Sequence, residues 1–294
     1  MRPSMLCVMA FSLVMVLVSA VHVGVLADDA VQLTTDPRTE LDPAWSPDGA
    51  LIAFALYEGS SPDIWVIPAA GGTATQLIDI PARESAEPCW SPDGSHLAFR
   101  TGSAIWVTPF GGSTWTEITS GGGYNGVPAW SPDGSQIAFS SLRSGNVDIW
   151  VIPATGGTAT QVTTDPGVDY RPSWSPDGSQ IVYSSDGGIC AIPATGGTPV
   201  QITTGGDDPC WSPDGTQIAF DSNRDIWVVP ATGGTPVRVT DDPAEDIRPC
   251  WSPDGSMITF VSNRAGHADI WVICAGGPSS AEESTWGRIK SLYK

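Results

Sequence analysis

The chain has 294 residues and a formal net charge of −19, from 32 acidic and 13 basic side chains. An acidic surface of this kind repels phosphate backbones, which argues against nucleic acid as a partner. Hydrophobic residues make up 41% of the chain, too many for a disordered protein, and 33 glycines and 26 prolines indicate many turns. This combination is typical of a fold built from many short strands.

The N-terminal segment, residues 1–27, differs from the rest of the chain. Arg2 supplies a positive charge, and an almost unbroken apolar stretch runs from Met5 to Ala27. This pattern predicts a secretory signal peptide. The alternative is an uncleaved N-terminal anchor, because the stretch is nearly long enough to span a bilayer. Both interpretations place the rest of the chain in the periplasm or the extracellular space.

The pentapeptide Trp-Ser-Pro-Asp-Gly recurs six times. Its copies begin at Trp45, Trp90, Trp130, Trp174, Trp211 and Trp251, at spacings of 45, 40, 44, 37 and 40 residues. A period of this size indicates a solenoid or a propeller. Within each repeat the apolar runs are short, turn residues separate them, and no helical periodicity is visible. Each repeat therefore predicts four short antiparallel strands, named A to D in chain order.

The pentapeptide is predicted to end strand A and to form the turn into strand B. Proline presets φ in the turn, aspartate bonds to the local backbone, and glycine accepts the positive φ before the next strand. The six aspartates could instead form a ring of acids for a metal or for catalysis. We favour the turn, because each aspartate stands where the turn needs one for its geometry.

Tryptophan predicts how the sheets assemble. Eleven of the thirteen tryptophans occupy either the pentapeptide or strand C, where they are Trp65, Trp106, Trp150, Trp227 and Trp271. Burying one tryptophan of ~200 Å² contributes at most ~5 kcal/mol. Strands B and C are also apolar on both faces, as expected for sheets that lie between two neighbours. The sequence thus predicts an all-β fold, a β-propeller with four antiparallel strands per blade.

The ends of the repeat region predict a closed ring of six blades. Residues 31–35 match the D strand at residues 200–204 but precede the first pentapeptide, and no D strand follows the last C strand at 269–273. We expect the N-terminal strand to complete the last blade, which removes the sheet edges. The propeller is expected to span residues 28–275, followed by a linker and C-terminal tail at 276–294.

The copies differ in two ways. The separation between the B-strand aromatic residue and the C-strand Trp or Cys is 11 residues in the first, third and sixth repeats and 7 in the others, so one face is expected to be uneven. Cys190 replaces the C-strand tryptophan in the fourth repeat. Cys89, Cys210 and Cys250 stand at a position where other copies have Ala or Ser, which favours packed free thiols over disulfides.

The pattern Pro-x-Trp-Ser-Pro-Asp-Gly-x-x-Ile-x-Phe, followed by Asp-Ile-Trp-Val, resembles the PD40 (WD40-like) repeat of the TolB propeller family. The resemblance covers about residues 30–275. It implies a six-bladed propeller outside the cytoplasm that binds a protein through one face, as TolB binds a peptidoglycan-associated lipoprotein. TolB also carries an α/β domain ahead of its propeller. We expect that domain to be missing here, because few residues separate Asp28 from Trp45, and so we do not predict a Tol–Pal role.

The connections from each D strand to the next A strand vary more than the turns and concentrate charged residues and tyrosine. Propeller geometry places these loops at one mouth of the central channel, and loops on a rigid scaffold commonly carry binding residues. The candidate binding residues are Arg38, Glu40, Arg83, Glu84, Tyr124, Asn125, Asp169, Tyr170, Arg171, Asp207, Asp208, Glu245, Asp246 and Arg248. The alternatives are a solvated acidic rim and, for Arg171 and Arg248, structural pairing with neighbouring acids.

Signals for catalysis are few. None of the three histidines has a metal-binding spacing, and no nucleophile elbow, phosphate-binding loop or EF-hand loop is present. Acidic clusters could hold Ca²⁺ without such a pattern, but we predict no cofactor, metal or catalytic residue. The sequence therefore predicts an exported, non-enzymatic scaffold that binds a protein or cell-envelope component. The alternative is a carbohydrate-active or lactonase-like enzyme with its site in the channel, since carboxylate pairs abound on the rim.

Overall fold

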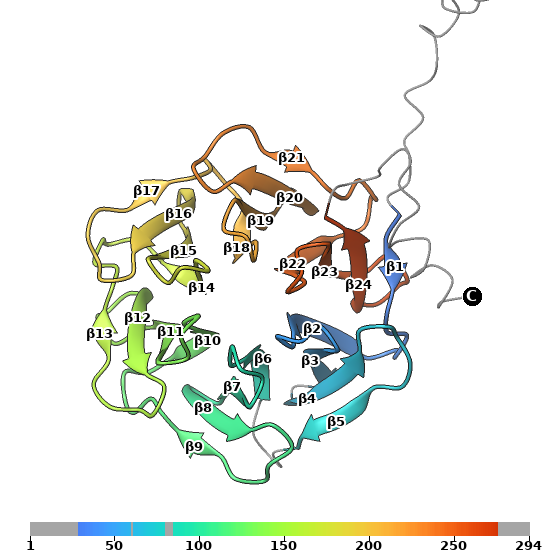
Figure 1. Ribbon diagram of the computed structural model, residues 1–294, viewed down its shortest axis with the longest axis horizontal. Helices are drawn as coiled ribbons and strands as arrows, with labels where there is room; N and C mark the ends of the chain where they lie inside the picture. The colour runs from blue at the N-terminus through green and yellow to red at the C-terminus, as the bar shows by residue number, and fades with distance from the viewer. Residues whose placement is uncertain (1–28, 60, 80–84, 276–294) are drawn as a thin grey trace, which may run out of the picture.

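The computed structural model describes residues 29–59, 61–79 and 85–275. Within these ranges the chain forms twenty-four strands and no helix, arranged as six four-stranded antiparallel sheets around a central axis (Figure 1). The prediction of a six-bladed β-propeller is confirmed. Nothing helical in these ranges is long and apolar enough to cross a membrane. The predicted signal segment and the C-terminal tail lie outside the described residues.

Each blade runs from an inner A strand to an outer D strand. Blade 1 contains β2 (Thr39–Trp45), β3 (Leu51–Glu58), β4 (Ser61–Pro68) and β5 (Thr75–Ile78). Blade 2 contains β6 (Ser85–Trp90), β7 (His96–Thr101), β8 (Ala104–Pro109) and β9 (Thr116–Glu117). Blade 3 contains β10 (Asn125–Trp130), β11 (Gln136–Ser141), β12 (Asp148–Pro153) and β13 (Thr160–Gln161). Blade 4 contains β14 (Tyr170–Trp174), β15 (Gln180–Ser185), β16 (Gly188–Pro193) and β17 (Val200–Gln201). Blade 5 contains β18 (Asp207–Trp211), β19 (Gln217–Ser222), β20 (Asp225–Pro230) and β21 (Val237–Arg238).

Blade 6 is built from both ends of the described chain. Strands β22 (Asp246–Trp251), β23 (Met257–Ser262) and β24 (Asp269–Cys274) are completed by β1 (Val31–Gln32). In the ribbon, blue β1 lies beside red β24 (Figure 1). The backbone N–H of Leu33 extends the pairing by donating to the carbonyl of Ile270 at 2.9 Å. The predicted closure by the N-terminal strand is therefore confirmed.

The pentapeptide forms the A–B turn in every blade, as predicted. In the first copy the Ser46 hydroxyl donates to Asp48 Oδ1 at 2.6 Å, and the same oxygen accepts the backbone N–H of Ala50 at 3.0 Å. The Ser46 hydroxyl also accepts the backbone N–H of Leu51 at 2.9 Å. The same three bonds recur in the other five turns. The six aspartates therefore shape turns at the end of the molecule away from the D–A connections.

These turns also contact one another around the ring. Gly134 has a φ of +71°, and a Cβ added there would stand 3.4 Å from Pro92 in the turn of the preceding blade. The same relation closes the circle, since a Cβ at Gly49 would stand 4.0 Å from Pro253. Proline and glycine thus serve the contact between turns as well as each turn's own geometry. This double role accounts for the sixfold recurrence of one short motif.

The hydrophobic core consists of six clusters, each between two neighbouring blades. The cluster between blades 6 and 1 contains Phe54 and Val272, both fully buried. The pentapeptide tryptophans cross the same boundaries, and Trp45 Nε1 donates to Thr259 Oγ1 at 3.1 Å. Packing between blades is therefore the main source of cohesion, because an isolated blade would leave both apolar faces in water.

All five cysteines of the described residues are free thiols, as the sequence suggested. Cys89, Cys210 and Cys250 line the central channel. Each directly follows the proline inside its A strand. In blade 4, Cys190 on β16 lies opposite Tyr183 on β15, where the other blades place tryptophan opposite phenylalanine.

Replacing Leu33 by alanine tests the closure. Leu33 follows β1, is 6% exposed and packs between blades 6 and 1, so we expect Leu33→Ala to lower the free energy of unfolding by about 2–5 kcal/mol in urea titrations. Val200→Ala in the equivalent strand of blade 4 is the control, because Val200 is 60% exposed and should tolerate the change. Equal stability of the two variants would mean that the N-terminal strand does not dock in solution.

Candidate functional site

Each A strand carries a β-bulge at the residue before its internal proline. The register against strand B shifts at this point in all six blades. Proline lacks an N–H, so it is tolerated on this innermost edge strand. The six residues at the bulge all have φ between 52° and 59° and line the channel; we call them the channel ring, and they are Asp42, Glu87, Val127, Arg171, Asp208 and Arg248.

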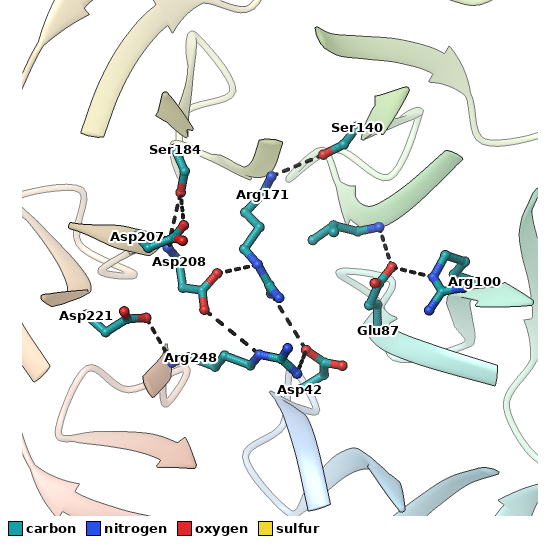
Figure 2. Close-up of polar contacts among 11 residues, drawn as sticks. Asp42, Glu87, Arg100, Ser140, Arg171, Ser184, Asp207, Asp208, Asp221 and Arg248 are labelled. Carbon is teal, nitrogen blue, oxygen red and sulfur yellow. Dashed lines mark hydrogen bonds and ion pairs between the residues drawn. The ribbon is translucent and has the colours of Figure 1, made fainter. Parts of the chain in front are cut away.

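Two arginines and two aspartates of the channel ring form one ion-pair network (Figure 2). Arg248 Nη1 lies 2.8 Å and Arg171 Nη1 lies 3.7 Å from the same oxygen, Asp42 Oδ1. On the other side, Arg171 Nε pairs with Asp208, and Arg248 Nε lies 3.9 Å from Asp208 Oδ2. Each arginine therefore bridges both aspartates, and the four charges balance.

The remaining carboxylate of the ring, Glu87, is also paired. Arg100 Nε from β7 lies 3.2 Å from Glu87 Oε2, which accepts the backbone N–H of Val127 at 2.6 Å. Glu87 thus ties blade 2 to blade 3 across the channel wall (Figure 2). Every charged member of the channel ring has a partner of opposite charge.

The B strand of the preceding blade positions three members of the ring. The backbone N–H of Arg171 donates to the Ser140 hydroxyl at 3.1 Å, and that of Asp208 donates to the Ser184 hydroxyl at 3.1 Å. The backbone N–H of Arg248 donates in the same way to Asp221 Oδ1 at 3.2 Å. The bulge is therefore held by neighbouring blades, and its side chains are fixed before any ligand arrives.

Asp221 lies beside this network, and its pKa is strongly raised. Burial raises the pKa of Asp221 to about 8, and the nearby carboxylates of Asp208 and Asp207 act in the same direction. Burial opposes the charged form of Arg171, but Asp208 and Asp42 outweigh it and raise the pKa of Arg171. Burial also raises the pKa of Asp208, whereas Arg171 and Arg248 oppose that shift and favour its charged form. Asp221 holds a proton near neutral pH.

Three half-buried tyrosines surround the channel mouth. Burial raises the pKa of Tyr124 to about 12, with a further contribution from Glu87, and burial with Asp42 raises the pKa of Tyr57. The Tyr124 ring lies over Gly126, where an added Cβ would stand 2.1 Å from its hydroxyl oxygen. The Tyr170 hydroxyl donates to Asp207. Phenol groups and paired ions therefore meet at this end of the channel.

The structure brings together six of the predicted site residues at the mouth. Arg171, Asp208 and Arg248 belong to the channel ring, and the alternative that the two arginines pair with neighbouring acids describes their contacts. The other three lie beside the ring: Tyr124, Tyr170 and Asp207. Arg83 and Glu84 lie outside the described residues.

Four other predicted residues are buried at the start of their A strands. Glu40 accepts the Thr34 hydroxyl, Asn125 Nδ2 donates to the carbonyl of Ser103 at 2.9 Å, and Asp246 accepts Arg264 Nη2 at 2.7 Å. The fourth, Asp169, is fully buried, and burial raises its pKa to about 6. The first three hold segments of the fold together through these hydrogen bonds, and all four are buried within the fold.

Two predicted residues lie on the periphery. Arg38 Nε donates to Asp36 Oδ1 at 2.8 Å, and its guanidinium lies over the Trp65 ring. Glu245 is exposed, and its backbone N–H donates to Asn263 Oδ1 at 2.9 Å. Neither side chain reaches the channel ring.

Sequence reasoning missed Val127 and five charged or phenolic residues that form the site. Asp42 and Glu87 precede the A-strand proline, as do the predicted Arg171, Asp208 and Arg248, so alignment of the repeats at this proline could have revealed them. The others, Tyr57, Arg100 and Asp221, belong to B strands, where no local signal distinguishes them. Among the described residues, no group of three or more His, Cys, Asp or Glu side chains could hold a metal ion.

A closed ring of six four-stranded blades with a charged inner wall defines a β-propeller of the WD40-like class. The family model for the TolB beta propeller domain, PD40, matches residues 100–220 and 199–292, together more than half of the chain. The chain therefore belongs to the PD40 TolB propeller family.

Solved structures share this fold at low identity. TolB from Acinetobacter baumannii is 21% identical, with a TM-score of 0.67 over 75% of this chain and 59% of that chain. A putative TolB from Agrobacterium tumefaciens is 22% identical, with a TM-score of 0.65 over 83% and 96%. An oligogalacturonate lyase from Vibrio parahaemolyticus is 11% identical, with a TM-score of 0.60 over 84% and 94%. A search of curated protein sequences found no match.

The first of these comparisons is partial, because the chain spans about three fifths of the length of the Acinetobacter TolB, 59%. A putative gluconolactonase also shares the fold at 16% identity, with a TM-score of 0.67 over 85% of this chain and 92% of that chain. TolB proteins and enzymes therefore both occur among the similar structures, and the likeness extends to the fold alone.

The pH dependence of stability tests the environment of Asp221. An unfolded aspartate ionises near pH ~4, whereas the folded-state pKa of Asp221 is about 8. As pH rises between these values, the unfolded state releases its proton first, so the contribution of Asp221 to stability is lost over this window. Asp221→Asn keeps the acceptor for Arg248 but cannot ionise. We expect this variant to lose less stability than the wild type between pH 5 and pH 8 in urea titrations.

Glu245→Gln is the matched control for charge removal, because the Glu245 side chain is exposed. Its unfolding midpoints should follow those of the wild type at both pH values. Parallel behaviour of Asp221→Asn and wild type would show that Asp221 is not buried as described.

Proposed function

We propose that this chain is an exported scaffold that binds a protein or cell-envelope component at the tyrosine-bordered mouth of its channel. The observation that carries the proposal is the pairing of every charged residue in the channel ring with an opposite charge. A pair of catalytic carboxylates must be free to accept or donate a proton, and those of the ring are already held by arginines. The ring therefore suits a rigid base for a binding surface.

The composition of the mouth supports a protein partner. Tyrosine and arginine are enriched among the residues that dominate protein interfaces, because they combine a large contact area with polar groups. Tyr57, Tyr124 and Tyr170 supply that area around the channel. Leu142 and Val168, in loops at the same end, are 43% and 41% exposed and add apolar contact.

Family membership and the N-terminal sequence support an envelope location. The PD40 match relates the chain to TolB, and residues 1–27 carry the features of a secretory signal. Both features support a location in the periplasm or outside the cell. An acidic surface of net charge −19 also favours partners with basic segments, which long-range attraction would bring to the mouth.

One observation favours the alternative, an enzyme with its site in the channel. Asp221, with a pKa of about 8, would hold a proton at neutral pH as a general acid does. Oligogalacturonate lyase and a putative gluconolactonase are among the similar structures, so carbohydrate or lactone substrates would be the first to test. The backbone N–H of Arg248 already donates a hydrogen bond to Asp221 Oδ1, so one carboxyl oxygen is engaged within the fold. This contact weakens the enzyme alternative.

Capture from a cell-envelope extract tests the proposal. Replacing Tyr124 and Tyr170 together by alanine removes two contact surfaces at the mouth, and we expect captured partner to fall about tenfold or more. The control replaces Thr155 and Thr195, exposed in turns at the opposite end, by glutamate and should retain the partner. Loss of capture in the control alone would overturn the assignment to the mouth. Turnover of an oligogalacturonate or a lactone that disappears in Asp221→Asn would support the enzyme instead.

A further inference from the structure

Two blades hold an arginine against a pair of aromatic rings. In blade 3 the Arg143 guanidinium carbon lies 5.0 Å from the ring centroids of both Phe139 and Trp150. In blade 6 the equivalent carbon of Arg264 lies 5.4 Å from Phe260 and 4.9 Å from the C-strand tryptophan. Both distances are within the range of cation–π attraction.

The polar contacts of these arginines also agree. Arg143 Nε donates to Ser141 Oγ at 3.0 Å and its Nη2 to Asn125 Oδ1 at 2.8 Å. Arg264 Nε donates to Ser262 Oγ at 2.9 Å, and its Nη2 donates to Asp246 Oδ2 at 2.7 Å. The repeat thus contains a slot for a guanidinium, formed by two rings, a serine at the end of strand B and an acceptor at the start of strand A.

Blade 1 fills its slot from a different loop. Its strand B ends on Glu58 where blade 3 has arginine, and Arg38 from the preceding D–A connection lies 5.6 Å from the centroid of the Trp65 ring. The side chains of Arg38 and Glu58 approach to 3.7 Å. A cavity lined by Phe54, Trp65, Thr34 and the neighbouring loop surrounds this guanidinium. Two unrelated loops therefore deliver the same chemical group to the same ring.

Blade 5 has the slot without an arginine in it. Its B–C turn is the short type: Arg224 follows Phe220 at the same spacing as Arg143 follows Phe139, but its side chain is exposed to solvent. A cavity of about 210 Å³ opens instead beside Phe220, Ser222 and the half-buried Trp227. Since one water molecule takes up ~30 Å³, a guanidinium group fits in this space. We call this cavity the blade 5 groove; its other lining residues are Thr203, Thr204, Gly205, Asn223 and Pro236.

The charges around the groove allow a cation to enter. Arg238, opposite Trp227 in the sheet, is committed to Asp225, with Nη2 2.8 Å from Oδ1. Arg224 in the adjacent turn is exposed. Gly206 stands where Asn125 stands in blade 3, so the groove offers rings and a hydroxyl but no carboxylate. Binding there would depend on the aromatic faces.

We propose that the blade 5 groove binds a guanidinium group from outside the chain, the side chain of an arginine in a partner polypeptide. The groove opens between the D–A connection and the B–C turn, at the same end of the propeller as the mouth. The proposal therefore adds a ligand class to the binding face inferred above. It does not depend on the channel ring, so a small probe can test it separately.

The experiment follows tryptophan indole resonances of the full chain by NMR during titration with N-acetyl-arginine amide. The indole N–H of Trp227 donates to the carbonyl of Ser222 at 3.0 Å, and the loss of one signal in Trp227→Phe assigns it. We expect a saturable shift of this signal at millimolar probe. N-acetyl-citrulline amide has the same shape without the charge, and we expect it to bind roughly tenfold more weakly, the size of one cation–π contact.

Arg143→Ala supplies the matched variant, because it empties the slot of blade 3. The Trp150 indole, unresponsive to the probe in the wild type, should then shift as that of Trp227 does, while the remaining signals stay in place. Absence of a saturable Trp227 shift, or equal shifts with the citrulline probe, would overturn the proposal. Neither result would bear on the mouth, whose test is capture by the tyrosine variants.

Discussion

The structure depends on one constraint, that each blade is apolar on both faces and must be covered twice. An open stack would leave two such faces in water, and at ~25 cal/mol per Å² their exposure would cost more than a domain's net stability can absorb. Closure removes both faces by placing β1 beside β24 and Trp45 against Thr259. The site follows from this closure, because only a closed ring brings Asp42 within reach of Arg171 and Arg248.

The structural features that could be predicted from the sequence are those whose local sequence pattern recurs along the chain. The turn, the strand order and the closing strand all repeat a local pattern whose physics does not depend on distant residues. The pairs in the channel could not be predicted in this way, because Asp42 and Arg248 are far apart in the chain and meet only through the ring. The buried positions of Glu40 and Asp246 were missed because a charged residue beside a loop gives the same sequence signal whether its side chain turns outward or inward.

The channel ring restricts what the propeller can bind. Removing one partner of a partly buried ion pair typically costs several kcal/mol, about 3–5 for a fully buried one. A ligand that entered the channel would have to replace the contacts of Arg171 and Arg248 with Asp208 and Asp42 before gaining its own. A ligand at the mouth meets tyrosines whose positions are already set and pays no such cost. The electrostatics of the wall therefore favour recognition at the mouth.

Differences among the blades carry as much information as their common pattern. A repeat that only needed to close a ring could use one loop length, yet in each of the three blades with a long B–C loop the C-strand tryptophan lies under an arginine. In these three blades an arginine guanidinium of the same chain covers the ring face of that tryptophan. In blade 5 the same rings and serine are present and the loop is short, so Trp227 keeps an aromatic face beside a cavity. The chain itself shows, in three blades, which chemical group such a face accepts.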